Sequence, residues 1–237
     1  MGPSLTLMNG AGGAGAGASI DFDGYDPGNV NPPAARIRSI DDGNYSSHIA
    51  FLAKTPGAAI NGLVENLRIN SNGNVGVGTS TPASKLHVIG DITVCGDILL
   101  TGADCAGHFD AADSLLPDAG TVVVIDESGR MRESNTAYDK KVAGIVSGAG
   151  EYRHALVLDK RPSDKGRIPV ALVGKVYCKV DAQYSPIEVG DLLTTSPTAG
   201  HAMKALNARQ AFGAIISKAL RAFQGHQGLI PILVALQ

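Results

Sequence analysis

Residues 86–102 read LHVIGDITVCGDILLTG and alternate strictly with a period of two. The even positions are all apolar or glycine: Leu86, Val88, Gly90, Ile92, Val94, Gly96, Ile98, Leu100 and Gly102. Because alternate side chains of a strand point to opposite faces, this spacing predicts an extended chain with one apolar face. A single ribbon of that kind is not stable in water on its own.

Glycine recurs every six residues in this segment, within VIGDIT, VCGDIL and LTGADC. Glycine permits backbone bends that a β-branched residue resists. The repeat therefore predicts a strand that kinks at regular intervals and can wind about an axis.

The neighbouring sequence offers no obvious sheet that could cover the apolar stripe. We therefore expect identical chains to wind together with the stripe inside, which makes Leu86, Val88, Ile92, Val94, Ile98 and Leu100 the predicted oligomer core. Burying these side chains would contribute roughly 9–18 kcal/mol per chain before entropy is subtracted. The alternative is one long hairpin that lies on the C-terminal domain of the same chain.

The composition favours an all-β chain. Among 237 residues, 44% are hydrophobic, 5% are aromatic and none is Trp, while 30 glycines and 12 prolines indicate many turns. A net charge of −2 gives no basic field for nucleic acid. The apolar run GLIPILVALQ is shorter than the roughly 20 residues that span a bilayer. We expect neither nucleic-acid binding nor membrane insertion.

Three segments follow from the sequence: a Gly/Asp/Pro-rich, loosely ordered leader at 1–33, a β-stalk at 34–103, and a β-rich cap at 104–237. Short alternating runs, ARIRSI, SHIAFLAK and ENLRINS, predict strands in the stalk. Residues 104–120 look like a helical turn region, and MKALNARQAF like a short helix. In the cap we predict seven strands, typical of a barrel or sandwich: 121–126, 142–147, 155–158, 168–180, 191–195, 212–219 and 229–236.

Residues 67–92, LRINSNGNVGVGTSTPASKLHVIGDI, resemble a widespread segment of bacteriophage tail-fibre and tail-spike proteins. That pattern has a G-N-V-G-hydrophobic-G-T run, a proline, and then K-L-hydrophobic-V-x-G. The segment GADCAGHFDAADSLLPDAGTVVVIDESGRMRESNTAYDKKVAGIVSG is similar to the start of the intramolecular-chaperone domain of phage neck-appendage proteins. IPVALVGKVYCKV, IEVGDLLTTSPTAGHAM and AFGAIISKAL continue the second resemblance.

The resemblance implies a homotrimer in a virion or a phage-derived appendage, with two identical chains as partners. It implies an intertwined, triple-β-helix-like stalk followed by a cap that brings the chains together in register. Such help is useful because long-range strand pairing is slow, and a register error turns the wrong face inward. A host surface glycan is a possible further partner.

In that family the cap can cut itself off before the aspartate of a motif like D-Y-A-E-x-F-[DE]. The aligned residues here are ADCAGHFD, with Ala103 at the serine position, Asp104 at the aspartate and Gly107 at the glutamate. Alanine has no hydroxyl to attack a carbonyl, and glycine has no group to move a proton. We therefore expect a vestigial junction without self-cleavage; His108 is the nearest substitute base.

Other clusters have simpler interpretations. Asp104, Cys105, His108, Asp110 and Asp113 do not have zinc or calcium spacing, and capping of a short helix explains them better. Rings of His87, Asp91, Asp97 or His108 around a trimer axis could hold an ion. Three cysteines, Cys95, Cys105 and Cys178, are expected to be buried free thiols. No phosphate-binding glycine motif occurs, and we expect neither a cofactor nor a metal.

Paired carboxylates would be needed for a glycan-degrading spike. The candidates are Asp21, Asp23, Asp26, Asp41 and Asp42, although Asp-rich loops are usually turns. Tyr25, Tyr45, His48 and Phe51 could contact a sugar but more often pack locally. The sequence thus predicts a structural protein: the C-terminal part of a trimeric fibre that sets register and presents its tip. The alternative is an enzyme, either a self-cleaving chaperone domain or a glycan hydrolase.

Overall fold

The structure is a computed structural model that describes all residues except 1, 3, 25–29, 113–114, 162, 164 and 236–237. Contacts divide the chain into two compact units, unit 1 (Met1–Asp97) and unit 2 (Ile98–Gln237). Both are built from strands, so the all-β prediction is confirmed. The described residues contain no helix with the length and apolarity needed to cross a bilayer.

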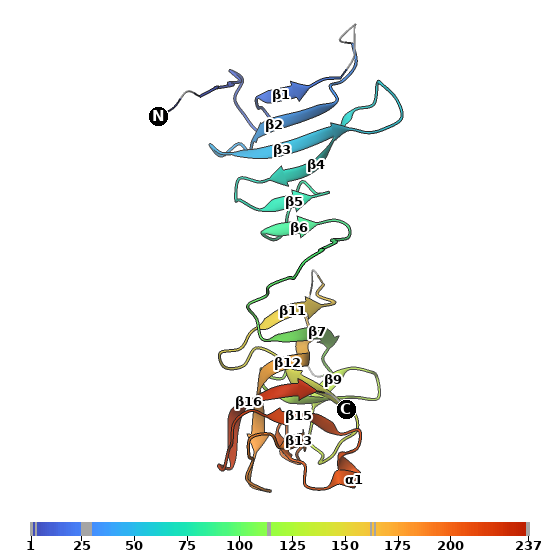
Figure 1. Cartoon of the computed structure of the whole chain (residues 1–237), viewed down its shortest axis with the longest axis vertical. Coiled ribbons are helices and arrows are strands. Elements are labelled where there is room, and N and C mark those ends of the chain that lie inside the picture. The colour runs from blue at the N-terminus through green and yellow to red at the C-terminus, as the bar shows by residue number, and fades with distance from the viewer. Residues whose placement is uncertain are drawn as a thin grey trace. The chain divides into compact units, whose positions relative to one another are not determined.

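Unit 1 is one six-stranded sheet in which the strands follow one another in chain order (Figure 1). Its strands are β1 (Ser19–Phe22), β2 (Ala35–Asp41), β3 (Ser47–Lys54), β4 (Leu63–Ile69), β5 (Val75–Val77) and β6 (Leu86–Val88). Neighbours pair antiparallel, except that β5 and β6 are parallel. The alternating runs predicted these strands, and turns rich in Asp, Asn and Gly join them.

The leader is not loosely ordered throughout, because residues 19–22 form β1. Ile20 pairs with Ile37, and Asp21 pairs with Arg36 across the ladder. The Arg36 guanidinium also donates a hydrogen bond of 2.8 Å to Asp21. Pairing with β2 orders this short segment, which could not fold by itself.

The long strand expected over residues 86–102 is wrong. β6 ends at Val88, and residues 90–102 make no backbone hydrogen bond to any other described residue. An alternating pattern determines which side chains share a face. A strand also needs a neighbouring strand that hydrogen-bonds its backbone N–H and C=O groups. The chain between Ile89 and Gly102 is extended and lacks such a neighbour.

Two of the three repeat glycines have a structural reason to be glycine. Gly90 has φ of +132°, a conformation that other residues rarely adopt. A Cβ at Gly102 would lie 2.4 Å from the backbone nitrogen of Ala155. Gly96 shows neither feature, but the chain bends at all three recurrences, at residues 89–90, 95–96 and 102–103, as the repeat predicted.

Unit 2 holds the remaining elements. They are β7 (Asp104–Asp110), β8 (Val122–Ile125), β9 (Met131–Glu133), β10 (Val142–Val146), β11 (His154–Leu158), β12 (Arg167–Asp181), β13 (Leu192–Thr195), β14 (Ala202–Lys204), α1 (Ala208–Ala211), β15 (Ile215–Ala219) and β16 (Gln227–Ala235). The long strand β12 is central: its first half pairs with β7 and β10, and its second half with β16.

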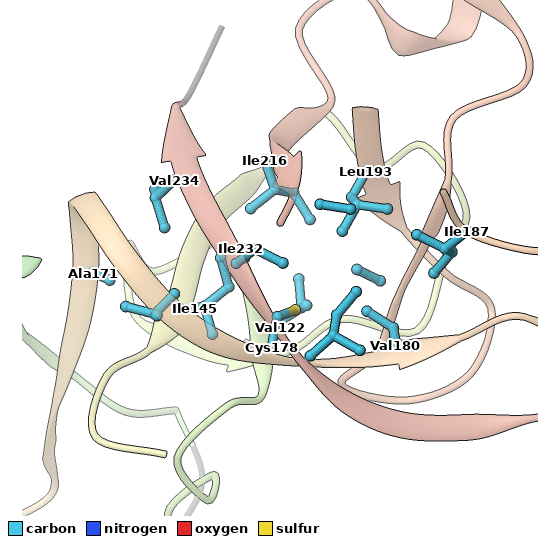
Figure 2. Packing of buried hydrophobic residues seen from close by; sticks show 14 of the residues in the cluster. Val122, Ile145, Ala171, Cys178, Val180, Ile187, Leu193, Ile216, Ile232 and Val234 are labelled. Carbon is cyan, nitrogen blue, oxygen red and sulfur yellow. The ribbon is translucent and has the colours of Figure 1, made fainter. Parts of the chain in front are cut away.

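Five strands of unit 2 close into a barrel. The order β12–β16–β15–β13–β14 returns to β12 through a parallel pairing of Val180 with Ala202. Side chains from β12, β13, β15 and β16 converge inside it (Figure 2), including Cys178, Leu193, Ile216 and Ile232. A second cluster packs β8, β10 and the first half of β12 together around Val123 and Val170. Unit 2 therefore has its own hydrophobic core.

The seven strands predicted in the cap are all present, within a few residues at each end, as β8, β10, β11, β12, β13, β15 and β16. Position 236, the last of the predicted strand 229–236, lies outside the described residues. The short helix is also confirmed as α1, where the Asn207 side chain accepts hydrogen bonds from the Arg209 and Gln210 amides. The helical turn expected over 104–120 is wrong, because residues 104–110 form β7.

The barrel core gives a direct stability prediction. Ile232 is fully buried in the cluster, whereas its neighbour Leu233 is 40% exposed on the other side of β16. Ile232→Ala should therefore lower the free energy of unfolding of unit 2 by about 2–5 kcal/mol. Leu233→Ala, the matched control, should cost less than about 1 kcal/mol. Denaturant unfolding followed by circular dichroism measures both; equal losses would contradict this placement of the core.

Candidate assembly surface and cleavage junction

One face of the unit 1 sheet is apolar across all six strands. Strand pairing places one residue from each strand in a single row: Ile20, Ile37, Phe51, Leu67, Val77 and Val88. The next row contains Ile49, Ile69, Val75 and Leu86. Paired residues share a face of the sheet, so these ten side chains form one surface, here named the apolar face.

The described part of unit 1 does not cover this face. Phe51 is 40% exposed, Ile49 is 45% exposed and Leu86 is 59% exposed. Ala50, on the opposite face, and Pro82, in the turn before β6, are the buried residues with apolar side chains described before Ile98. Both hydrophobic clusters of the chain lie in unit 2. Unit 1 is thus a single layer with no core of its own.

The opposite face of the sheet is mixed: it carries Ile40, Ala50 and Leu52 together with charged and polar side chains that are paired with one another. Arg68 donates two hydrogen bonds of 2.7 Å to Glu65, and Arg36 is paired with Asp21. His48 accepts a hydrogen bond from the Ser71 amide. Water solvates such a face without difficulty, so the contrast identifies the apolar face as the side that needs a partner.

The predicted oligomer core residues fall into two groups. Leu86 and Val88 belong to the apolar face, where they line up with residues of β5 and β4. Ile92, Val94, Ile98 and Leu100 lie on the extended segment after β6 and are 46–65% exposed. Within their own units, the described residues do not bury these four side chains.

Exposed apolar residues continue in unit 2 on three adjacent strands. Leu156 of β11 pairs with Cys105 of β7, which pairs with Val173 of β12. Leu156 is 47% exposed and Val173 is 57% exposed. Of the three residues, only Cys105 lies close after Ile98 and Leu100 in the sequence.

The predicted cleavage junction is an ordinary peptide in the middle of a sheet. The Ala103 amide donates to the Arg153 carbonyl at 2.7 Å, and the Ala103 carbonyl accepts from the Lys175 amide at 2.9 Å. Asp104 is 4% exposed. Residue 103 is therefore hydrogen-bonded on both sides, through its amide on one and its carbonyl on the other, and Ala103 supplies no hydroxyl.

A side chain at Gly107 would first meet the ring of Phe109. A Cβ at this position would lie 2.9 Å from the ring of Phe109 and 3.4 Å from a methyl group of Leu172. Gly107 lies in the central strand β7, paired with Leu158 and Val170. Phe109 thus fills the space that a longer side chain would need.

His108 cannot replace that carboxylate directly. Adjacent residues of a strand point to opposite faces, so the His108 side chain lies on the other side of β7 from position 107. The His108 carbonyl accepts a hydrogen bond of 2.6 Å from Arg167, which ties this part of β7 to β12.

The acidic cluster does not cap a helix, because its described members are in or beside a strand. Asp110 accepts from the Arg167 guanidinium at 3.1 Å. Asp113 lies outside the described residues. Among the described residues, no three His, Cys, Asp or Glu side chains are grouped so that they could hold a metal ion. His87 accepts a hydrogen bond from the Ala83 amide.

The cysteines are free, but only one is buried. Cys178 lies in the barrel core, where burial raises the pKa of its thiol well above its usual range. Cys105 is partly buried, and Cys95 is exposed on the extended segment. The expectation of three buried thiols is therefore wrong for Cys95, whose segment has no covering layer.

The glycan candidates have local roles where they are described. Asp41 accepts from the Gly43 amide, and Asp42 accepts from Asn44 and Ser46, as expected of turn residues. These hydrogen bonds lower the pKa of Asp42, and Arg36 lowers that of Asp21. Tyr45 is fully exposed with φ of +61°. Asp23 accepts a hydrogen bond from the Gly24 amide, and Tyr25 and Asp26 lie outside the described residues.

Unit 2 contains two cavities large enough to hold a small ligand. One of about 310 Å³ lies over Gly107, Phe109 and Leu158, beside the ion pair of Arg167 with Asp159. A larger one of about 670 Å³ is lined by Leu115, Leu116 and Arg132, and the described residues around it include none of the predicted site residues. Neither brings together a nucleophile and a base.

No protein-family model and no curated protein sequence matches the chain. Among solved structures, the chain is similar to the pre-mature gene product 12 of bacteriophage phi29. The TM-score is 0.40 and the identity 15%, over 72% of this chain and 24% of that one. This chain therefore spans about a quarter of the length of that protein, and the likeness is coarse.

The junction predicts an intact polypeptide. On a denaturing gel the chain should run as one band of 24.3 kDa after prolonged incubation. Ala103→Ser alone should also stay intact, because Gly107 still provides no proton-transfer group. Two fragments divided before Asp104 in the unmodified chain would contradict the loss of self-cleavage.

Proposed function

We propose that this chain is part of a homotrimeric fibre of the bacteriophage-appendage type. In this proposal three copies bury their apolar faces and extended segments against one another, and unit 2 acts as a permanently attached cap that sets register. Presentation of a receptor-binding surface at the fibre tip belongs to the same proposal, without assigned residues. The observation that carries it is the uncovered apolar face of a one-layer sheet.

The energy available is large enough for stable association. The ten side chains of the apolar face are about half covered, so completing their burial would contribute roughly 8–15 kcal/mol per chain before entropy is subtracted.

The unpaired backbone of residues 90–102 supports the same arrangement. Its N–H and C=O groups, together with Ile92 and Val94, have no partner in the described chain. A strand from a second copy would satisfy both the backbone and the apolar side chains at once. The proposed number of three copies rests on the resemblance of residues 67–92 to tail-fibre segments.

The two enzymatic alternatives have less support. A self-cleaving cap needs a nucleophile and an acid or base, and Ala103 and Gly107 supply neither. A glycan hydrolase needs two facing carboxylates, whereas Asp21, Asp41 and Asp42 are engaged in an ion pair or in turns. A structural role is therefore the function that we propose.

The proposal predicts that a charge at the centre of the apolar face blocks assembly. Phe51 lies in the row that crosses all six strands, so Phe51→Asp would place a carboxylate between copies without a counter-charge. Sedimentation should show a trimer for the unmodified chain and a monomer for Phe51→Asp. Circular dichroism should show that unit 2 of the variant still unfolds cooperatively.

A matched pair on β1 provides the control. Ile20 belongs to the apolar face, whereas Ser19 is exposed on the opposite face beside Arg38. Ile20→Asp should weaken assembly, and Ser19→Asp should leave it unchanged. Equal behaviour of the two variants, or a dimer instead of a trimer, would contradict the proposed interface or its symmetry.

A further inference from the structure

Asp104 is a buried carboxyl group without a hydrogen-bond partner. It is the first residue of β7, and its exposure is 4%. Both of its carboxylate oxygens are buried, and neither makes a hydrogen bond of good geometry to protein. An ionised carboxylate in such a place would be strongly unfavourable.

The backbone around Asp104 explains its burial. β7 lies between β11 and β12, with Asp104 opposite His154 on one side and Gly174 on the other. Gly174 has φ of +113°, and a Cβ there would lie 2.7 Å from the Asp104 Cα. β12 can pass this close only because residue 174 has no side chain.

The charged groups on the packed elements do not neutralise Asp104. Arg153, just before β11, donates to the carbonyls of Gly148, Gly150 and Tyr152. Lys175 of β12 places its ammonium group 5.3 Å from the centre of the Tyr152 ring. The exposed His154 is the one group whose charge lowers the pKa of Asp104.

From the end of β10, Ser147 presents a second buried polar atom. Its hydroxyl also makes no hydrogen bond of good geometry, although it lies close enough to Asp104 to affect it. Burial raises the pKa of Asp104, and Ser147 and His154 offset this only in part. A hydroxyl oxygen can accept a hydrogen bond from a protonated carboxyl group, so the buried Ser147 and Asp104 side chains are compatible when Asp104 is uncharged.

We propose that Asp104 is an uncharged carboxylic acid in the folded chain at neutral pH, and that its ionisation loosens β7 from β11 and β12. Asp104 then makes unit 2 less stable as the pH becomes alkaline. Protonation holds the first strand of the cap in place, and ionisation creates an uncompensated charge inside the sheet.

The sign of the pH dependence follows from the direction of the shift. A carboxyl with a raised pKa in the folded chain binds more protons than in the unfolded chain. Its contribution to stability is therefore complete below the ordinary Asp pKa of about 3.9. It is lost as the pH rises through the folded value. The opposite holds for Asp21, Asp42 and Asp191, whose pKa values are lowered. Their contributions to stability are lost as the pH falls into the acid range.

Infrared spectroscopy of the full chain tests the protonation state directly. At pH 7 the unmodified chain should show a protonated carboxyl band, and the band should be missing from Asp104→Asn. The other described Asp and Glu residues with resolved shifts all have lowered pKa values and should be ionised: Asp21, Asp42, Asp126, Glu127, Asp159, Asp181 and Asp191. No band in the unmodified chain, or an unchanged band in the variant, would overturn the proposal.

Denaturant unfolding tests the consequence. Between pH 5 and 9 the unfolding midpoint of the unmodified chain should fall progressively relative to that of Asp104→Asn, which mimics the neutral acid. Asp118→Asn, a control whose side chain is 90% exposed, should follow the unmodified profile. Parallel profiles for all three chains would refute the proposal. If Asp104→Asn does not fold, the unmodified chain supplies the same test. As the pH rises, its infrared carboxyl band and the hydrogen-exchange protection of the β7 amides should be lost together.

Discussion

The structure of unit 1 depends on one constraint: a single-layer sheet has one face that water solvates well and one that it does not. Arg36, Arg68 and their acidic partners occupy the first face. The row from Ile20 to Val88 occupies the second. No second layer in the described chain separates that row from solvent, so the sheet is complete only when another surface covers it.

Unit 2, by contrast, buries its own apolar side chains. Its barrel buries Ile216, Ile230 and Ile232 completely, and the strand β12 connects the barrel to the smaller cluster around Val170. A body with its own core can fold before the copies meet. The extended segment after β6 cannot, because its pairing partners must come from far away in sequence or from another chain. This difference gives a physical basis for a cap that folds first and then fixes the register of the rest.

Most strands could be predicted from the sequence because the two-residue alternation is visible within each short run. The sequence predicted the stripe of Leu86 and Val88 for the same reason. It did not reveal the apolar face, because Ile20, Phe51 and Val88 come together only through strand pairing. The strand β7 was missed because CAGHFD lacks the β-branched residues that usually mark one. The burial of Asp104 was also hidden, since it depends on the close passage of Gly174, seventy residues away.

The account rests on association of identical chains, and the native mass of the unmodified protein tests this most directly. Analytical ultracentrifugation or native mass spectrometry at micromolar concentration should give a single species of about 73 kDa, three times the chain mass of 24.3 kDa. A stable species of 24.3 kDa would contradict the account. It would mean that water, or some other part of the same chain, covers the apolar face.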